Sequence, residues 1–442
     1  MAAVRENSTI KRDWWEIAYL VIFGVIVAHD FLDATMFEIA WPPKFGLLLY
    51  FAIMVYTIAM LCLHNPYSPK ELVCALIILA AFVAAAVIGD NSFLFEVGFL
   101  IVGARAVRFD RILSVFFGVS LVILLAAMAA SQLGMIENLV YPCVRGGVRQ
   151  SFGTIYPTDF AAHVFYMTLA ALCIGNRRIH VWDIMIVMIL AAAVYIECSA
   201  FTGTMTLILT AVGLIFVMLA QHRAEKGINP VVVMDFGENA PAEPQQTAWR
   251  DAFTVLRFDE DGDYETSEEA IQMARGPQGV WNVILRLLTL APAVLAALFL
   301  ALTHFYDEAS AFWTRLDTML SLRLSVSAEG VKTYAYHLFG QHVEEMGNGR
   351  SIETRENYFF IDDSYLRMAL IYGIVILVVV LLMMIVIANR AIYNRRAALY
   401  LAMLVIAVHC FMEQHILEMA FNPFLLGMFA DMSWVRKKPH NK

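Results

Sequence analysis

The chain has 442 residues, of which 60% are hydrophobic and only 16% are charged, and its mean hydropathy is +0.66. Soluble globular domains contain roughly 45–50% apolar and about 25% charged residues, so this composition excludes an ordinary soluble protein. The formal net charge of −8 says little, because the acidic excess is concentrated in one loop. We expect an all-α polytopic membrane protein, since apolar stretches of about twenty residues recur and can cross a hydrocarbon core about 30 Å thick.

The apolar stretches predict about twelve transmembrane helices in a single transmembrane domain over residues 1–442. No small-residue cleavage site follows the first stretch, so we expect it to be retained as a helix. Two long loops remain, at 221–279 and 303–367, and the second lies between the ninth and tenth helices. The predicted helices cover about residues 14–32, 45–63, 72–89, 93–104, 112–131, 158–175, 183–200, 204–220, 280–303, 366–388, 397–411 and 417–431.

The distribution of Lys and Arg orients the chain, because cytoplasmic loops of membrane proteins are enriched in both. With a cytoplasmic N-terminus, about two thirds of the 31 Lys and Arg residues fall on the cytoplasmic side. The short segments RAVRFDR, NRRIH and ANRAIYNRR all lie there. We therefore predict that both termini are cytoplasmic and that the 303–367 loop is extracytoplasmic.

The 221–279 loop is predicted to be cytoplasmic and contains the acidic run RFDEDGDYETSEE. An EF-hand calcium loop needs glycine at its sixth position, but Gly262 is the fourth residue counted from Asp259. We reject a calcium site and expect a solvated connector.

The 303–367 loop departs from the orientation rule, because it is basic although it is predicted to be extracytoplasmic. Apolar residues recur at helical spacing between Arg323 and Gly340, which predicts an amphipathic helix along the membrane surface. Apolar residues flank Arg323, so this side chain needs an anionic partner if it is even partly buried. The basic residues of the loop are Arg315, Arg323, Lys332, Arg350, Arg355 and Arg367.

A second basic segment precedes the sixth predicted helix. Arg145 and Arg149 are four residues apart, so one helix face or one loop edge could present both. Two guanidiniums suit a pyrophosphate, because each forms planar bidentate hydrogen bonds with phosphate oxygens. The alternative is a turn-rich loop whose arginines reach lipid headgroups. His163, inside the helix that follows, is expected to be a hydrogen-bonded core residue.

Carboxylates and a histidine lie near the extracytoplasmic ends of the late helices. Asp362 and Asp363 are adjacent, so in a helix they point about 100° apart and do not form a paired dyad. One of them could act as a base or hold an arginine, while Asp363 or Ser364 could cap the helix that follows. Glu413 and His415 could form a general-base pair or lie at headgroup level.

The dipeptide Asn422-Pro423 interrupts the last apolar stretch. Proline removes a backbone donor and breaks helices, and irregular backbone at membrane depth occurs where it is buried or lines a cavity. We therefore expect a broken or re-entrant helix there.

Together, these segments resemble the Wzy-type polysaccharide polymerases, in the superfamily that also contains the O-antigen ligases. Two positions depart from the family pattern, because Asp159 follows Thr158 where many relatives have Pro-Asn, and Thr202 stands where an Arg often follows the Ser turn. The resemblance rests on five motifs in order: Arg149 to Pro157, Ser199 to Gly203, Arg323 with Leu338-Phe339-Gly340, Phe360 to Tyr365, and Glu413 with Asn422 to Leu425.

The resemblance implies transfer of an undecaprenyl-pyrophosphate-linked glycan onto the terminal hydroxyl of another lipid-linked repeat unit, outside the bacterial cytoplasmic membrane. It implies membrane lipids, a chain-length regulator and a flippase as partners, with no nucleic acid and no cofactor. No metal motif occurs in the predicted outer loops, so we expect arginines to neutralise the leaving pyrophosphate.

The residue roles follow from this reaction. Arg145, Arg149 and Arg323 are the candidates for the pyrophosphate. The candidates for the general base are Glu413, Asp362 and His415, in that order. Asp363, Tyr365 and Gly340 are further candidates because they lie within the shared motifs.

Three other functions remain open, of which a structural or signalling role is disfavoured by the arginines of the outer loop. A ligase that moves the same glycan onto a different acceptor fits the same residues. A flippase or transporter of the lipid-linked glycan would place charges deep within several helices, whereas the predicted helices here are nearly free of them.

Overall fold

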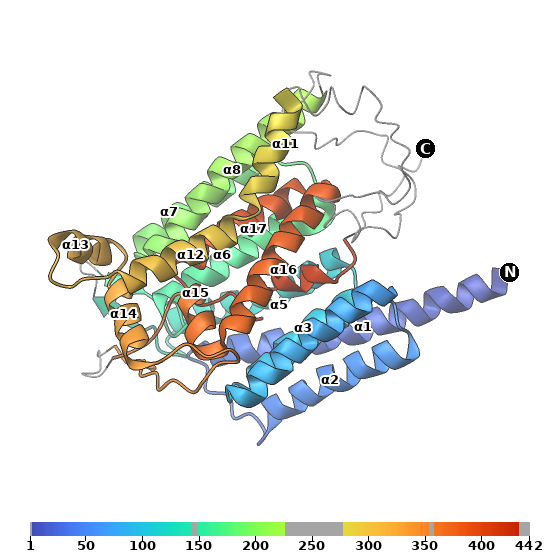
Figure 1. Ribbon diagram of the computed structural model, residues 1–442, viewed down its shortest axis with the longest axis horizontal. Coiled ribbons are helices and arrows are strands. Elements are labelled where there is room, and N and C mark those ends of the chain that lie inside the picture. The colour runs from blue at the N-terminus through green and yellow to red at the C-terminus, as the bar shows by residue number, and fades with distance from the viewer. Residues whose placement is uncertain (1, 143–147, 226–276, 348, 353–357, 433–442) are drawn as a thin grey trace.

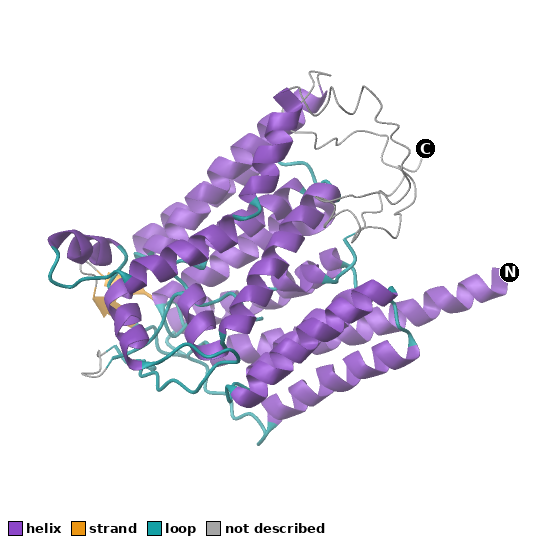
Figure 2. Cartoon of the chain, viewed as in Figure 1, coloured by secondary structure: helices purple, strands orange, loops and turns teal. Residues whose placement is uncertain are grey.

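The computed structural model describes residues 2–142, 148–225, 277–347, 349–352 and 358–432. Within these residues the protein is mostly helical, with one short antiparallel hairpin of β1 (Val140–Pro142) and β2 (Val148–Gln150). Figure 2 shows the hairpin in orange beside the purple helices. The predicted helical fold is confirmed. Arg145, Arg355 and the acidic run of the 221–279 loop lie outside the described residues.

Eight helices among the described residues are long and apolar enough to cross a membrane. Only 22% of the most apolar stretch of α7 is buried, against 72% for α6, so α6 is central and α7 faces the surroundings. Exposed apolar side chains on so many helices are expected for a protein whose solvent is lipid. Two of the stretches continue beyond their α-helix, since α6 is extended by the 3-10 turn η2 (Ile174–Asn176) and α7 by the π-helix η3 (Val194–Cys198). The eight stretches lie in α1 (Ala2–Asp33), α2 (Phe45–Leu63), α3 (Pro69–Ile88), α5 (Phe109–Gln132), α6 (Pro157–Cys173) with η2, α7 (Val181–Ala193) with η3, α8 (Phe201–Glu225) and α16 (Ile374–Tyr393).

Three further predicted helices form but are short or interrupted. α4 (Phe93–Gly103) has 11 residues, a length of about 16 Å, which by itself is less than the hydrocarbon core. The ninth apolar stretch forms two helices, α11 (Pro277–Leu288) and α12 (Ala291–His304). The eleventh forms α17 (Ala397–His409).

Three short basic segments meet at one end of the helices, which we call the basic end. Arg111 forms an ion pair with Glu16 near the start of the first apolar stretch, with 2.5 Å between Nη1 and Oε2. Arg396 lies 2.6 Å from Asp110, and Asn176 donates to the carbonyl of Arg395. The sequence placed these segments on the same side, and the structure brings them together.

The opposite end of the helices carries the 303–367 loop, and we call it the site end. α13 (Ala311–Met319) and α14 (Arg323–Thr333) lie there, at the left of Figure 1, whereas α1 begins at the right. The helix that we expected to reach Gly340 ends at Thr333. The backbone beyond it is irregular, because it pairs with the break in the next apolar segment: Ile374 and Val375 donate to the carbonyls of His337 and Leu338.

The break in the tenth apolar segment separates α15 (Ser364–Arg367) and the π-helix η4 (Met368–Tyr372) from α16. Gly373 marks the break, with a φ of 100° that L side chains rarely adopt. The tenth predicted helix over 366–388 is therefore present but interrupted.

The prediction of a twelfth helix over 417–431 is wrong. The segment crosses from Glu413 at the site end to Asp431, which donates to the carbonyl of Val107 at the basic end, but it consists of turns and one 3-10 helix, η5 (Phe424–Met428). The side chain of Asn422 donates to the carbonyl of Ile416 and accepts the amide of Phe424, and these bonds replace the backbone hydrogen bonds of a helix.

Arg390 supports this irregular segment from α16. Its guanidinium donates to the carbonyls of Gly427, Met428 and Ala430. All residues from 419 to 430 are buried. Irregular backbone at membrane depth needs such internal partners, so the broken form expected at Asn422-Pro423 is confirmed.

Candidate active site

Arg323 is the first residue of α14, and a tight connection from α13 sets its position. Asp317 replaces the usual N-cap, since its Oδ1 accepts the amides of Leu324 at 2.8 Å and Ser325 at 3.1 Å. Leu322 reverses the chain with a left-handed φ of 64°. These contacts direct the Arg323 side chain away from the loop and toward the helices.

The Arg323 guanidinium joins two distant segments. Its Nε donates to the carbonyl of Met412 at 2.5 Å, and its Nη2 lies 3.1 Å from Oε1 of Glu413 and 3.5 Å from Oδ2 of Asp362. The side chain is only 11% exposed. The expected anionic partner of Arg323 is therefore present, and it consists of two carboxylates. Among the described residues, Nη1 makes no hydrogen bond.

Glu413 follows the end of α17 and is buried. Its carbonyl accepts a hydrogen bond from the Ser364 hydroxyl at 2.5 Å, and its carboxylate lies near Thr202 at the start of α8. Burial raises the pKa of Glu413, while the charge of Arg323 opposes the shift. A carboxylate with a raised pKa is a stronger base than an exposed one, as a general base near neutral pH requires.

Asp362 and Asp363 have different roles, as their adjacency predicted. Asp363 caps α15, because its Oδ1 accepts the amide of Leu366 at 2.7 Å and its Oδ2 accepts the hydroxyl of Ser327 at 3.1 Å. Burial raises the pKa of Asp363 to about 7. Asp362 is about one third exposed and points to Arg323. Of the two, only Asp362 is open to a substrate.

His415 pairs with Glu418 rather than with Glu413. Its Nδ1 lies 2.9 Å from Oε2 of Glu418, while its Nε2 has no hydrogen-bond partner among the described residues. Although burial lowers it, the charge of Glu418 raises the pKa of His415. His415 also interacts electrostatically with Glu413 and with Asp159 in the first turn of α6.

A column of stacked rings supports His415. Its ring stacks on Phe421 at 3.9 Å between centroids, Phe421 stacks on His163 at 3.9 Å, and His163 stacks on Phe31 at 3.6 Å. His163 is fully buried, as expected, but neither ring nitrogen has a hydrogen-bond partner among the described residues. The column fixes His415 against α6 and α1.

Arg149 lies on β2 and takes part in a different contact. Its Nε donates to the carbonyl of Cys198 at 3.0 Å, at the end of the π-helix η3 (Val194–Cys198). Ser199 follows in a left-handed conformation, and α8 then presents Thr202 to Glu413. Arg149 therefore reaches the site through the α7–α8 turn rather than through Arg323.

Gly340 and Tyr365 lie in the frame of the site. A Cβ at Gly340 would come within 2.3 Å of the carbonyl oxygen of Ile371, so only glycine fits this close approach. Tyr365 is fully buried, and its hydroxyl donates to the carbonyl of Ala407 at 2.6 Å. Both residues hold the broken tenth segment in place.

The other basic residues of the 303–367 loop do not join Arg323. Arg367 is paired with Glu345, with 2.7 Å between Nη2 and Oε2, and lies over the ring of Phe360. The remaining described members are exposed: Arg315, Lys332 and Arg350.

The sequence placed Glu418 beside Glu413 and His415, but it did not assign Asp159 or Thr202 to this cluster. Asp159 and Thr202 were visible as departures from the motif, and each lies in the first turn of a helix that begins at the site end. A polar residue in the first turn of an apolar helix is the signal that would have found them.

Comparisons with protein-family models, characterised proteins and solved structures found no match to this chain.

Proposed function

We propose that this chain polymerises lipid-linked oligosaccharide repeat units by glycosyl transfer from an undecaprenyl-pyrophosphate donor. The observation that carries the proposal is the contact of one Arg323 guanidinium with Glu413 and Asp362. A cation that binds phosphate and a buried carboxylate base are the two groups that this reaction requires, and here they touch.

Arg323 serves the leaving group. Carboxylate and phosphate oxygens are both anionic acceptors for a guanidinium, so Glu413 and Asp362 occupy donors that a pyrophosphate would use. Nη1 offers a further donor that makes no hydrogen bond among the described residues. Arg149 is a second contact, since among the described residues its guanidinium donates through Nε alone, and Arg145 is kept as a candidate from its sequence position.

Glu413 serves the acceptor. It takes the proton of the terminal hydroxyl while that oxygen attacks the anomeric carbon of the donor sugar. The bond between this carbon and the pyrophosphate oxygen breaks, and its electron pair remains on undecaprenyl pyrophosphate, where Arg323 stabilises the added charge. Asp362 orients Arg323, and His415, held by Glu418, interacts electrostatically with Glu413.

The site end faces outward in this proposal, and both termini are cytoplasmic. The three basic segments that meet at the other end support this orientation, because Lys and Arg collect on the cytoplasmic side. The protein then lies in the bacterial cytoplasmic membrane, downstream of a flippase that delivers the lipid-linked unit and beside a chain-length regulator.

The test uses proteoliposomes that contain the purified full-length chain and a lipid-linked repeat unit. We expect a ladder of longer glycans on a gel, with release of undecaprenyl pyrophosphate. Movement of the substrate between leaflets without growth would identify a flippase. Transfer of the glycan only to an added non-identical acceptor would identify a ligase, and either result would reject polymerisation.

A further inference from the structure

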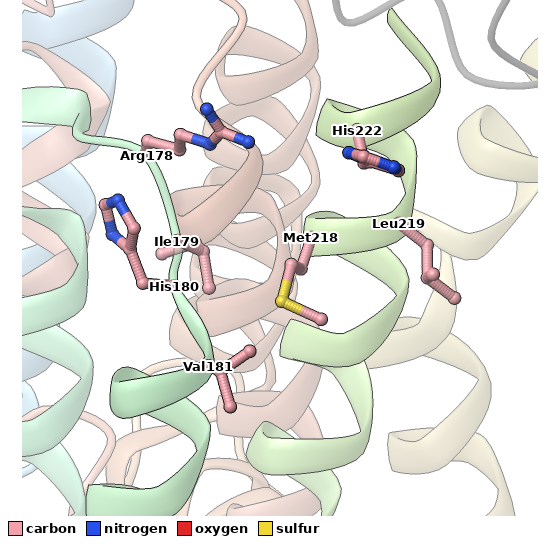
Figure 3. Close-up of a pocket in the computed structure, with 7 residues that line it drawn as sticks. All are labelled: Arg178, Ile179, His180, Val181, Met218, Leu219 and His222. Atoms are coloured by element: carbon pink, nitrogen blue, oxygen red, sulfur yellow. The ribbon is translucent and has the colours of Figure 1, made fainter. Parts of the chain in front are cut away.

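Exposed apolar side chains occur at both ends of the helices. At the basic end, Figure 3 shows Val181, Met218 and Leu219 lining a pocket of about 280 Å³ between α7 and α8. This apolar surface belongs to two of the long apolar stretches, so contact with lipid accounts for it. At the site end, exposed apolar side chains also occur on α13, which lies outside these stretches and needs another explanation.

One side of α13 is apolar and uncovered by the described residues. Phe312 is 67% exposed and Met319 is 69% exposed. The two lie within about 20° of each other around the helix, because seven residues make almost two full turns. Leu322, just beyond the helix, is exposed as well. Together these side chains form an apolar side of α13 that faces away from the protein.

A second side of α13 is fixed to the protein. Trp313 and Leu320 pack against the core, and Trp313 lies beside Tyr306 with 6.3 Å between ring centroids. Asp317 is buried and accepts the first amides of α14. The rotation of α13 about its axis is therefore set, and so is the direction of its apolar side.

The third side of α13 is polar. Thr314 and Thr318 are exposed and lie about 120–160° from Phe312 around the helix. The two exposed sides of α13 thus differ in polarity, although both would face water if the helix were surrounded by solvent. Such an amphipathic pattern is typical of a helix that lies in a membrane surface.

The apolar side of α13 follows a lipid-facing side of α12. Val294, Leu298 and Phe305, the last at the C-cap of α12, are exposed and lie within about 40° of one another around the helix. Because α12 forms from the ninth apolar stretch, we expect this side to contact acyl chains. Figure 1 shows α13 beyond the end of α12. The exposed apolar surface therefore continues from a membrane helix onto α13.

We propose that the apolar side of α13 inserts into the bilayer surface at the site end, with Phe312 and Met319 among the upper parts of the acyl chains. Amphipathic helices of this kind bury their apolar face about 5–10 Å into the boundary between headgroups and acyl chains. Arg315 is exposed next to this face, and its long side chain reaches the lipid phosphates. Since Asp317 also holds the start of α14, the inserted helix fixes Arg323 close to the bilayer surface.

Cysteine variants of the full-length chain, labelled with a fluorescent probe and placed in phosphatidylcholine nanodiscs, test this contact. Phe312→Cys and Met319→Cys put the probe on the apolar side. Thr314→Cys and Thr318→Cys are the matched controls on the polar side of the same helix. All four positions are exposed, so none of the changes leaves a cavity. The parent chain carries Cys62→Ser, because Cys62 is an exposed free cysteine, and the signal of the labelled parent is subtracted.

Two quenchers distinguish lipid from water and from protein. We expect lipids with a nitroxide near the headgroup end of the acyl chain to quench the Phe312→Cys and Met319→Cys probes about threefold more strongly than the two controls. Iodide in the buffer should give the opposite order. Equal quenching by iodide on both sides would show that the apolar side faces water. Protection of the Phe312→Cys probe from both quenchers would show that a second copy or another protein segment covers it, and either result would overturn the proposal.

Discussion

Nη2 of Arg323 lies 3.1 Å from Oε1 of Glu413, although the two residues are 90 positions apart in the chain. The contact ties helix α14, in the 303–367 loop, to the irregular segment that follows α17. Both side chains are buried, so removal of Arg323 would leave Glu413 as an unpaired charge, whereas removal of Glu413 would leave Arg323 with Asp362 alone. In the proposed reaction, a pyrophosphate that binds Arg323 weakens the contact between Arg323 and Glu413. Binding of the donor therefore makes the Glu413 carboxylate a stronger base.

Arg323→Lys should abolish polymerisation while the protein still inserts. Lysine keeps the charge but has no planar fork, so it cannot contact Met412, Glu413 and a phosphate together. We expect a loss of about 10²-fold or more in the proteoliposome assay, the range for loss of one preorganised donor. Arg350→Lys, at an exposed position of the same loop, is the control and should remain active. Normal polymer from the Arg323 variant would exclude pyrophosphate binding by Arg323.

Glu413 should act in its deprotonated form. Burial raises its pKa, so the rate should fall as the pH drops through a value above the ~4.3 of a free glutamate side chain. Glu413→Gln should lower the rate about 10²–10⁴-fold and abolish this acidic limb of the pH profile. Asp362→Asn should reduce the rate less, because Asp362 lies farther from Arg323 and is more exposed. If Asp362→Asn is the more damaging change, Asp362 is the base instead.

Asp363→Asn should alter stability in a pH-dependent way. Burial raises the pKa of Asp363 to about 7, so the folded state favours the protonated side chain. The contribution of Asp363 to the free energy of unfolding is therefore complete below its unfolded pKa of about 3.9 and is lost as the pH rises through 7. Asparagine keeps the N-cap without the charge. We expect the thermal midpoint of the variant, relative to wild type, to rise between pH 5 and pH 8. A difference that does not change over this range would contradict a buried, titrating Asp363.

Gly340→Ala should destabilise the protein more than the replacement of a glycine with a positive φ usually does. A Cβ there would clash with the Ile371 carbonyl at 2.3 Å, and φ is +87°. Gly134→Ala is a matched control, because Gly134 has a φ of +71° but nothing within 4 Å of a Cβ. We expect the control to cost about 1–2 kcal/mol and Gly340→Ala about 1–3 kcal/mol more, measured by thermal unfolding in detergent. Equal effects would show that the close approach is unimportant.

The apolar stretches predicted most helices because length and hydropathy are local properties. The twelfth failed for a reason that is not local. Residues 419–430 are apolar enough to resemble a helix, but the carbonyls of Gly427, Met428 and Ala430 are satisfied by Arg390, which is distant in sequence. The helix expected to reach Gly340 ended early for the same kind of reason, since its residues pair with the break at Gly373. Periodicity carries no information about such long-range partners.

The candidate site was predicted in part. Arg323, Asp362 and Glu413 stand out in the sequence because charges at the ends of apolar helices are costly, and the structure brings these three together. The sequence left open whether His415 pairs with Glu413 or lies at headgroup level, and the structure pairs it with Glu418 instead. Asp159 came from a helix that is central only in the folded bundle, and no local pattern indicates this.

Arg390→Gln should prevent stable folding, whereas Arg286→Gln should be tolerated. Arg390 is buried and donates to the carbonyls of Gly427, Met428 and Ala430, and each carbonyl left unpaired costs about 1–3 kcal/mol. Arg286 lies in the ninth apolar stretch but is exposed, so its loss leaves no buried group unpaired. The measurement is the yield of monodisperse protein in size-exclusion chromatography, with the thermal midpoint of what survives. Comparable yields for the two variants would show that the crossing segment does not need Arg390, and its irregular backbone would then require another source of hydrogen bonds.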